Sequence, residues 1–241
     1  MFAILFAIDF KVTNSWRIFV IKINKMSVKL AIFDLDGTLV NTIGDLGSSC
    51  NAVLAAHGFP THPMEDYKIF IGRGMRNLIR QAMPPEVLTE ALLDQCFEEY
   101  KQQYLGHIYD FSYDYQGMNA LLEGLTKAGI KTAVASNKIQ EGTDRLINHF
   151  FPDIPFVAIM GFGPDRPLKP NTAMVEEAMA KAGASREETV LIGDSMMDLQ
   201  TAANAAIRFI AVSWGFRPLS DASYATFTAA SPQAILEYCV E

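Results

Sequence analysis

Short apolar runs and amphipathic stretches alternate along most of the chain. The apolar runs that have the length of buried strands are 28–33, 131–135, 156–160, 189–193, 209–212 and 225–227. Apolar residues recur at helical spacing over 118–128, 140–150 and 171–182, in a stretch that ends at 205, and after Ser231-Pro232. This alternation predicts an α/β fold with a doubly wound, Rossmann-like parallel sheet covered on both faces. In such folds ligands bind at the carboxyl ends of the strands.

A long segment after the first strand departs from this alternation. Helical periodicity covers 43–57, 75–82 and 86–105, and no strand pattern interrupts it. Residues 43–110 are therefore predicted to form an all-α cap domain. The cap is inserted into an α/β core made of residues 27–42 and 111–241.

The first 26 residues fit this plan poorly. Residues 1–8 are apolar, but Asp9 interrupts the run and no basic segment precedes it, unlike a secretory signal. The run is also too short to span a bilayer. Residues 17–24 have the pattern of an extra strand, whereas Met26 offers a second translation start. Residues 1–26 are expected to be either an over-extended start or a genuine extra element.

Charge and cysteine content narrow the partners and the compartment. The formal net charge of −7 argues against nucleic acid, whose binding requires clustered Lys and Arg. The three cysteines, Cys50, Cys96 and Cys239, are scattered and odd in number, which favours a reducing cytoplasm over a disulfide framework. No membrane partner is expected. Monomer and homodimer both stay open.

Two aspartates follow the first strand directly. The stretch 34–42 reads Asp-Leu-Asp-Gly-Thr-Leu-Val-Asn-Thr. Because side chains alternate along an extended chain, Asp34 and Asp36 can leave the strand tip on the same side. Gly37 then allows the chain to turn without steric cost. Two solvated aspartates in a turn would give the same isolated Asp-x-Asp, but the whole string after an apolar strand is far more specific.

This string resembles the nucleophile motif of the haloacid dehalogenase-like hydrolase superfamily, most of whose members are magnesium-dependent phosphatases. The resemblance implies that Asp34 is the nucleophile and forms an aspartyl-phosphate. It implies that Asp36 protonates the leaving oxygen and later takes a proton from water. Dehalogenases and ion-pumping ATPases of the superfamily lack an acid at that position, so Asp36 favours phosphate ester hydrolysis.

Two further stretches extend the resemblance. In Ser136-Asn137-Lys138, at a strand end, the Ser136 hydroxyl and nearby backbone N–H groups are suited to phosphate oxygens, and Asn137 is included in that phosphate site. Lys169 precedes a predicted helix, and the resemblance gives its charge a catalytic and phosphate-binding role. Without this context, a surface lysine would be the simpler interpretation of Lys169.

The last motif contains the remaining carboxylates. Residues 193–198 read Gly-Asp-Ser-Met-Met-Asp after an apolar strand. The resemblance implies that Mg²⁺ is the cofactor, bound by Asp34, the backbone carbonyl of Asp36 and Asp194. Asp198 would act from behind the ligands by orienting Lys169 or metal-bound water.

Two positions depart from the family pattern. Thr172 stands where relatives usually have a second proline, and Ala206 stands where they often have glycine. The first is expected to loosen the start of a helix and the second to affect a turn, while the chemistry is retained.

The position of the cap and two short stretches bear on the substrate. Residues 71–75 and the Ser136-Asn137-Lys138 stretch are similar to those of phosphoglycolate phosphatases. The best prediction is a cytoplasmic phosphatase that hydrolyses a small phosphorylated metabolite, 2-phosphoglycolate in the first instance. Arg73 is predicted to bind the substrate carboxylate. Arg76 and Arg80 follow at helical spacing, where a role in binding and a solvated face are equally compatible with the pattern.

Other functions use the same residues or the same fold. Pyrophosphatase, sugar-phosphate phosphatase and β-phosphoglucomutase all stay open within the superfamily. A signalling receiver domain is also doubly wound around an aspartate that accepts phosphate, but it requires neither Asp36 nor a helical insertion. A scaffold without turnover is disfavoured because the whole set of motif residues is present.

Overall fold

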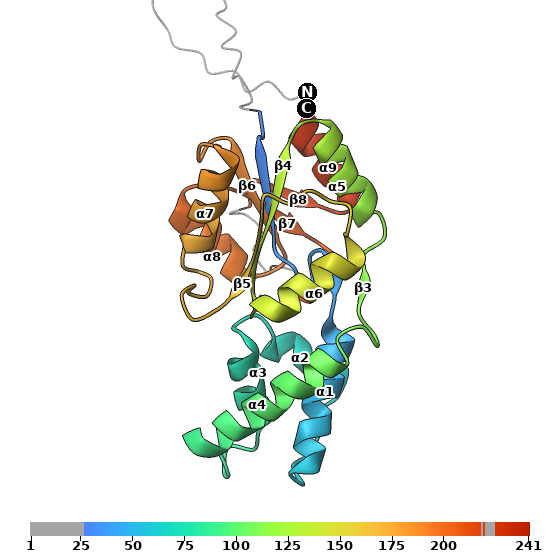
Figure 1. Ribbon diagram of the computed structural model, residues 1–241, viewed down its shortest axis with the longest axis vertical. Helices are drawn as coiled ribbons and strands as arrows, with labels where there is room; N and C mark the ends of the chain where they lie inside the picture. Colours follow the sequence, from blue (N-terminus) through green and yellow to red (C-terminus); the bar gives the residue numbers. More distant parts are fainter. Residues whose placement is uncertain (1–26, 218, 220–224) are drawn as a thin grey trace, which may run out of the picture.

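A parallel sheet forms the centre of the computed structural model, which describes residues 27–217, 219 and 225–241 (Figure 1). The expectations for residues 1–26 lie outside these described residues. The order of the sheet is β5-β4-β1-β6-β7-β8, and every neighbouring pair is parallel. The strands are β1 Leu30–Phe33, β4 Lys131–Ile139, β5 Ala158–Phe162, β6 Thr189–Gly193, β7 Arg208–Val212 and β8 Phe227–Ala229.

Strand β1 lies in the middle of the sheet, between β4 and β6. All its residues are buried, which explains why it appears in the sequence as a continuous apolar run. Leu30 and Ile32 face one hydrophobic core, and Ala31 and Phe33 face the other. The carboxyl ends of β1, β4 and β6 therefore meet at one edge of the sheet, where the sequence motifs lie.

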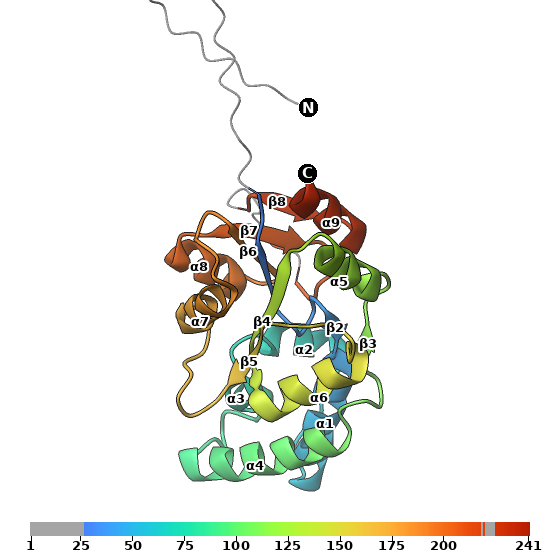
Figure 2. The ribbon, with the colours of Figure 1, turned by 45° about the horizontal axis from the view of Figure 1, so that its top comes forward.

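Helices cover both faces of this sheet (Figures 1 and 2). Helices α7 Ala173–Ala182 and α8 Met196–Ala205 lie on one face, and α5 Met118–Lys127, α6 Gln140–Phe150 and α9 Pro232–Val240 lie on the other. The predicted doubly wound α/β fold is confirmed by this arrangement.

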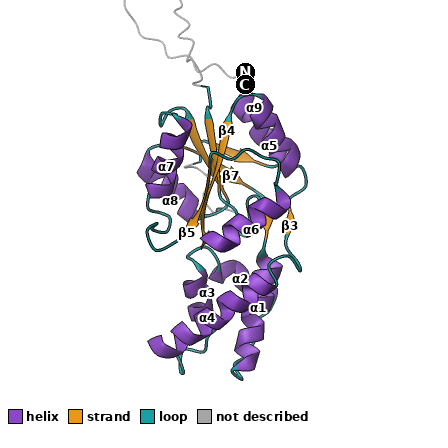
Figure 3. Cartoon of the chain, in the orientation of Figure 1, coloured by secondary structure: helices purple, strands orange, loops and turns teal. Residues whose placement is uncertain are grey.

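A separate group of helices lies beyond the carboxyl edge of the sheet (Figure 3). It consists of α1 Ile43–Ala56, α2 Met64–Phe70, α3 Met75–Ala82 and α4 Glu90–Gly106. The short strands β2 Val40–Asn41 and β3 Tyr113–Asp114 pair antiparallel where the chain leaves the core and returns to it. This helical insertion covers the edge where the motif loops gather.

One helix and two element boundaries differ from the sequence prediction in the cap and beside it. The sequence reading missed α2, a seven-residue helix in which Tyr67 is the buried residue. Helix α4 begins at Glu90, not at 86, because the Thr89 side chain caps it by accepting a hydrogen bond from Leu92 N. Strand β4 continues to Ile139 instead of ending at 135, through a register irregularity against β5.

Smaller differences occur at the remaining ends. Strands β5 and β8 each lie two residues later than predicted. Asn171 does not cap α7; Thr172 holds that position without a capping side-chain bond, and Asn171 accepts from Ala173 N. Ala206 adopts a left-handed φ of 52°, the conformation that glycine would take without strain. Within the described part of the chain, no helix is both long and apolar enough to cross a membrane.

Candidate active site

Asp34 leaves the carboxyl end of β1 and is buried. The loop after it is tightly built, with the Leu35 carbonyl accepting hydrogen bonds from the N–H groups of residues 38, 39 and 40. Gly37 has a φ of 84°, and a Cβ there would lie 2.5 Å from Asp194 Oδ2. A glycine is therefore required both for the turn and for the close approach of the two motif loops.

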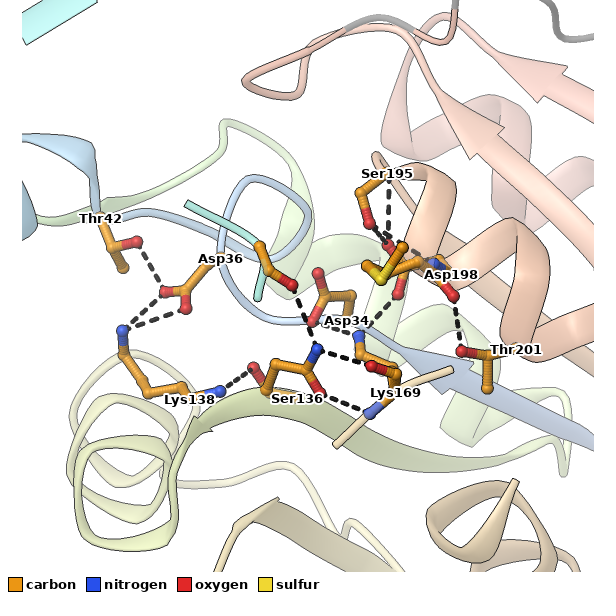
Figure 4. Close-up of polar contacts among 12 residues, drawn as sticks. Asp34, Asp36, Thr42, Ser136, Lys138, Lys169, Ser195, Asp198 and Thr201 are labelled. Atoms are coloured by element: carbon orange, nitrogen blue, oxygen red, sulfur yellow. Dashed lines mark hydrogen bonds and ion pairs between the residues drawn. The ribbon is translucent and has the colours of Figure 1, made fainter. Parts of the chain in front are cut away.

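Lys169 joins two of the motif carboxylates (Figure 4). Its Nζ lies 2.8 Å from Asp34 Oδ1 and 2.6 Å from Asp198 Oδ1. Burial disfavours the ammonium, but the charges of Asp198 and Asp34 outweigh it and raise the pKa of Lys169 above its usual value. The lysine is thus a fixed positive charge at the tip of β1.

Both carboxylate oxygens of Asp198 bond to other groups of the protein. Besides Lys169, it accepts hydrogen bonds from Ser195 N and Ser195 Oγ as part of the capping box of α8. Asp198 therefore bonds directly to Lys169, and its role as a support for that lysine stays a prediction.

Asp34 and Asp194, the other two carboxylates of this group, are suited to bind a divalent cation. Ligand oxygens of Asp34, Asp194 and Asp198 lie within 4.8 Å of one another, and Lys169 is the cation that bonds to this group in the described residues. Burial, followed by the charge of Asp198, raises the pKa of the Asp34 carboxyl. Burial, followed by Asp34, raises that of Asp194. Asp194 has one oxygen bonded to Phe216 N, and the excess negative charge beside it matches the oxygen-rich environment that Mg²⁺ prefers.

Ser136 and Asn137 lie on the extension of β4. Ser136 is buried, and its Oγ accepts a hydrogen bond from Lys138 N. The Asn137 side chain braces its neighbours: Oδ1 accepts from Lys169 N, and Nδ2 donates to the carbonyls of Lys169 and Gly72. The predicted phosphate contact of Asn137 would then come from its backbone, because both ends of the amide are occupied.

Asp36 has different partners from Asp34. Thr42 Oγ1 donates to Asp36 Oδ1 at 2.6 Å, and Lys138 Nζ lies 2.8 Å from Oδ1 and 3.1 Å from Oδ2. In Figure 4 the Asp36 carboxylate points toward Thr42 and Lys138, on the side away from Asp34 and Lys169. The two aspartates of the first motif thus have separate cations.

A cavity lies between these motif residues and the cap. Its cap wall consists of side chains and backbone from α1, α2, α3 and the loop between α2 and α3: Leu46, Lys68, Ile71, Gly72, Gly74, Met75 and Leu78. Arg217 lines it from the core and donates to the carbonyls of Ile69 and Ile71. The cap is therefore bonded to the core above the carboxylates.

The predicted specificity residue Arg73 lies outside this lining. Its side chain is exposed, although the glycines on both sides of it line the cavity. Lys68, on α2, is the cap cation that lines the cavity among the described residues.

Arg76 and Arg80 serve the cap itself. Arg76 pairs with Glu90 and Asp94 of α4, and Arg80 pairs with Glu90. The basic stripe on α3 is thus explained by ion pairs between two cap helices.

The sequence pattern predicts no role for four residues that lie at the site: Lys138, Thr42, Lys68 and Arg217. One signal was present for Lys138: if the strand continues past 135, Ser136 and Lys138 point to the same side. Arg217 and Lys68 are brought together only by cap packing, for which local sequence carries no signal.

Comparisons with known proteins agree with this geometry. The family model described as haloacid dehalogenase-like hydrolase matches residues 31–212. A phosphoglycolate phosphatase of Agrobacterium fabrum is 34% identical over 189 residues, which cover 78% of this chain and 81% of that protein. One from Caulobacter vibrioides is 32% identical over 186 residues, or 76% of this chain and 78% of that protein.

A solved structure is similar over nearly the whole length. The crystal structure of a provisionally named phosphoglycolate phosphatase from Lactobacillus delbrueckii subsp. bulgaricus has a TM-score of 0.81 at 30% identity. The match covers 89% of this chain and 99% of that one.

Proposed function

Because the chain belongs to the haloacid dehalogenase-like hydrolase family, we propose that it is a Mg²⁺-dependent phosphatase acting through an aspartyl-phosphate on Asp34. The observation that carries this proposal is the meeting of Asp34, Lys169, Asp194 and Asp198 at the carboxyl edge of the sheet, beneath the cap. The curated phosphoglycolate phosphatases to which the chain is similar support the same class of reaction.

The first step transfers the phosphoryl group to the protein. An Asp34 oxygen attacks phosphorus in line with the ester oxygen, while Asp36 gives that oxygen a proton. Asp36 then removes a proton from the water that cleaves the aspartyl-phosphate. Dividing the hydrolysis in this way replaces one difficult displacement with two easier ones.

Fixed positive charge and hydrogen-bond donors hold the phosphate during both steps. Lys169 offsets the negative charge that gathers at Asp34, and the Ser136 hydroxyl with the backbone of Asn137 offers donors. Asp34, Asp194 and the Asp36 carbonyl would hold Mg²⁺, which neutralises charge on the transferring phosphoryl group. Asp198 keeps Lys169 in place.

The proposed substrate is 2-phosphoglycolate, the compound named by the similar curated proteins. Pyrophosphate, sugar phosphates and a β-phosphoglucomutase type of transfer are the alternatives. Enzymes for all of these reactions would use the same motif residues. A series of phosphorylated metabolites assayed for phosphate release with Mg²⁺ tests this choice. Highest kcat/KM on 2-phosphoglycolate is expected, whereas preference for pyrophosphate or a hexose phosphate would assign the enzyme to another branch of the family.

We propose that Arg73 binds the carboxylate of the substrate. Lys68, the cap cation that lines the cavity, is the alternative residue for this contact. Arg73→Ala is expected to lower kcat/KM for 2-phosphoglycolate roughly 10- to 100-fold, since a hydrogen bond to a charged group is worth ~1.5–3 kcal/mol. Hydrolysis of p-nitrophenyl phosphate, which has no carboxylate, should scarcely change. If Lys68→Ala shows this selective loss and Arg73→Ala does not, the role belongs to the lysine that lines the cavity.

We also propose that the enzyme acts in the cytoplasm, as a monomer or homodimer. The three cysteines are buried, and Cys50 and Cys96 are free thiols, which agrees with a reducing compartment.

A further inference from the structure

Lys138 is a buried cation to which the mechanism above gives no task. It lies on the extension of β4, two residues after Ser136, and only 3% of it is exposed. A buried ammonium is costly unless it is paired and hydrogen-bonded. Its acidic partner is Asp36, the proposed acid–base, and both residues line the cavity.

Lys138 bonds to both oxygens of the Asp36 carboxylate. The distances from Nζ are 2.8 Å to Oδ1 and 3.1 Å to Oδ2. Thr42 adds a second donor to Oδ1. The carboxylate therefore has a fixed direction, and a positive charge lies directly beside it (Figure 4).

The cap holds the ammonium in place. Tyr104 of α4 is fully buried, and the centre of its ring is 4.7 Å from Lys138 Nζ. A cation over an aromatic face is attracted most strongly where water is excluded. The position of the Lys138 charge thus depends on a residue of the cap as well as on β4.

We propose that Lys138 is a positioning residue for Asp36: together with Thr42 it fixes the direction of the Asp36 side chain in the cavity. The inference rests on the proposed function, in which Asp36 is the acid. In this role Lys138 acts through Asp36, and no contact between Lys138 and the phosphate is required.

The first step requires the Asp36 carboxyl to point at the ester oxygen of the substrate. The bond from Asp34 oxygen to phosphorus forms as the bond from phosphorus to the ester oxygen breaks. The electron pair of the broken bond stays on the ester oxygen, which takes the Asp36 proton. Because Asp36 lines the cavity, the bonds from Lys138 and Thr42 act by fixing the direction from which this proton is given.

The test compares two leaving groups. An alcohol leaves poorly without a proton, whereas p-nitrophenolate is a stable anion that needs none. The ratio kcat/KM reports the steps up to departure of the leaving group, before Asp36 acts as a base. Lys138→Met should therefore lower kcat/KM roughly 10- to 100-fold for an alkyl phosphate, the loss of a bond between charged groups. It should change the value for p-nitrophenyl phosphate less than threefold, on the order of the context-dependence of single contacts.

Asp36→Asn supplies the reference for this comparison. It should lower kcat/KM for the alkyl phosphate by roughly 10²–10⁴-fold, the usual contribution of a general acid. In the double variant, Lys138→Met should cause no further loss, because the carboxyl through which it acts is gone. The alkyl substrate is 2-phosphoglycolate, or glycerol phosphate if the metabolite series excludes it.

Two other variants separate this role from a structural one. Lys138→Arg keeps the charge and should restore part of the alkyl phosphate activity. Lys131→Met removes a lysine from the far end of the same strand, where Nζ bonds to the Ala182 carbonyl, and should leave the ratio between the substrates unchanged. Thermal unfolding of each variant shows whether it is folded.

The outcomes distinguish the inference from its premise. Equal losses on both substrates in Lys138→Met, or independent losses in the double variant, would show that Lys138 serves the phosphate or the fold, and would overturn the inference. A selective loss in Asp36→Asn alone would overturn it too and leave the proposed mechanism intact. If Asp36→Asn itself shows no selectivity, the acid role fails, and the inference fails with it.

Discussion

Replacing Asp34 by asparagine is expected to abolish hydrolysis of every phosphate ester the enzyme accepts. An amide oxygen cannot form the covalent phosphoryl intermediate at a useful rate, and Asp34 is the carboxylate that directly follows β1. The loss should appear in kcat for p-nitrophenyl phosphate and for the best metabolite alike, measured with excess Mg²⁺. Asp165→Asn, at an exposed aspartate, is the control and should keep full activity.

The same variant should fold at least as well as the parent protein. Asp34 is one of three buried carboxylates in this group, and Lys169 bonds to two of them, Asp34 and Asp198. Lys169 keeps its bond to Asp198 when Asp34 is neutral. Removing a charge from that group relieves repulsion. A melting temperature equal to or above that of the parent would therefore assign the lost activity to chemistry. Substantial turnover by Asp34→Asn would remove Asp34 from the role of nucleophile.

Removal of Mg²⁺ is the second change with a large expected effect. Dialysis against EDTA should eliminate turnover, and added Mg²⁺ should restore it, since the phosphoryl group carries negative charge into a site already lined with carboxylates. A full rate in EDTA would exclude the metal-dependent mechanism.

Metal binding also has a readout that does not depend on activity. A cation that binds only the folded protein at 100 times its Kd adds about 2.7 kcal/mol to the free energy of unfolding. The melting temperature should therefore rise with MgCl₂ relative to NaCl at equal ionic strength. Asp194→Asn should reduce that rise, while the exposed Asp165→Asn should not. An equal rise in both variants would mean that the ion binds elsewhere.

The meeting of three motifs of the candidate site could be predicted, because each lies at the carboxyl end of a strand in one parallel sheet. Once β1, β4 and β6 are recognised as buried strands, their carboxyl ends must share an edge, and Asp34, Ser136 and Asp194 must meet there. The resemblance implies a contact between Asp198 and Lys169, and in the structure the capping box of α8 orients Asp198 for it. For Asp34, Ser136 and Asp194, short-range sequence patterns and the sheet topology were sufficient to predict that the side chains meet.

The residues that line the cavity from the cap were harder to predict from the sequence, because tertiary packing decides which side chains reach the cavity. Helix α2 has seven residues, too few for periodicity to reveal it, and it places Lys68 in the cavity. The position of Arg73 between two glycines predicts a close approach to the substrate, but its side chain is exposed in the structure. The continuation of β4 depends on pairing with β5, and that continuation sets the direction of Lys138.

The proposed covalent step can be tested by isolating the phosphorylated protein. Enzyme mixed with Mg²⁺ and excess substrate is quenched in acid within one turnover, digested and sequenced by mass spectrometry. One phosphoryl group on Asp34, absent from Asp34→Asn, is the result that the mechanism predicts. Steady turnover with no phosphorylated peptide at any time, or with the phosphoryl group on a residue other than Asp34, would contradict it.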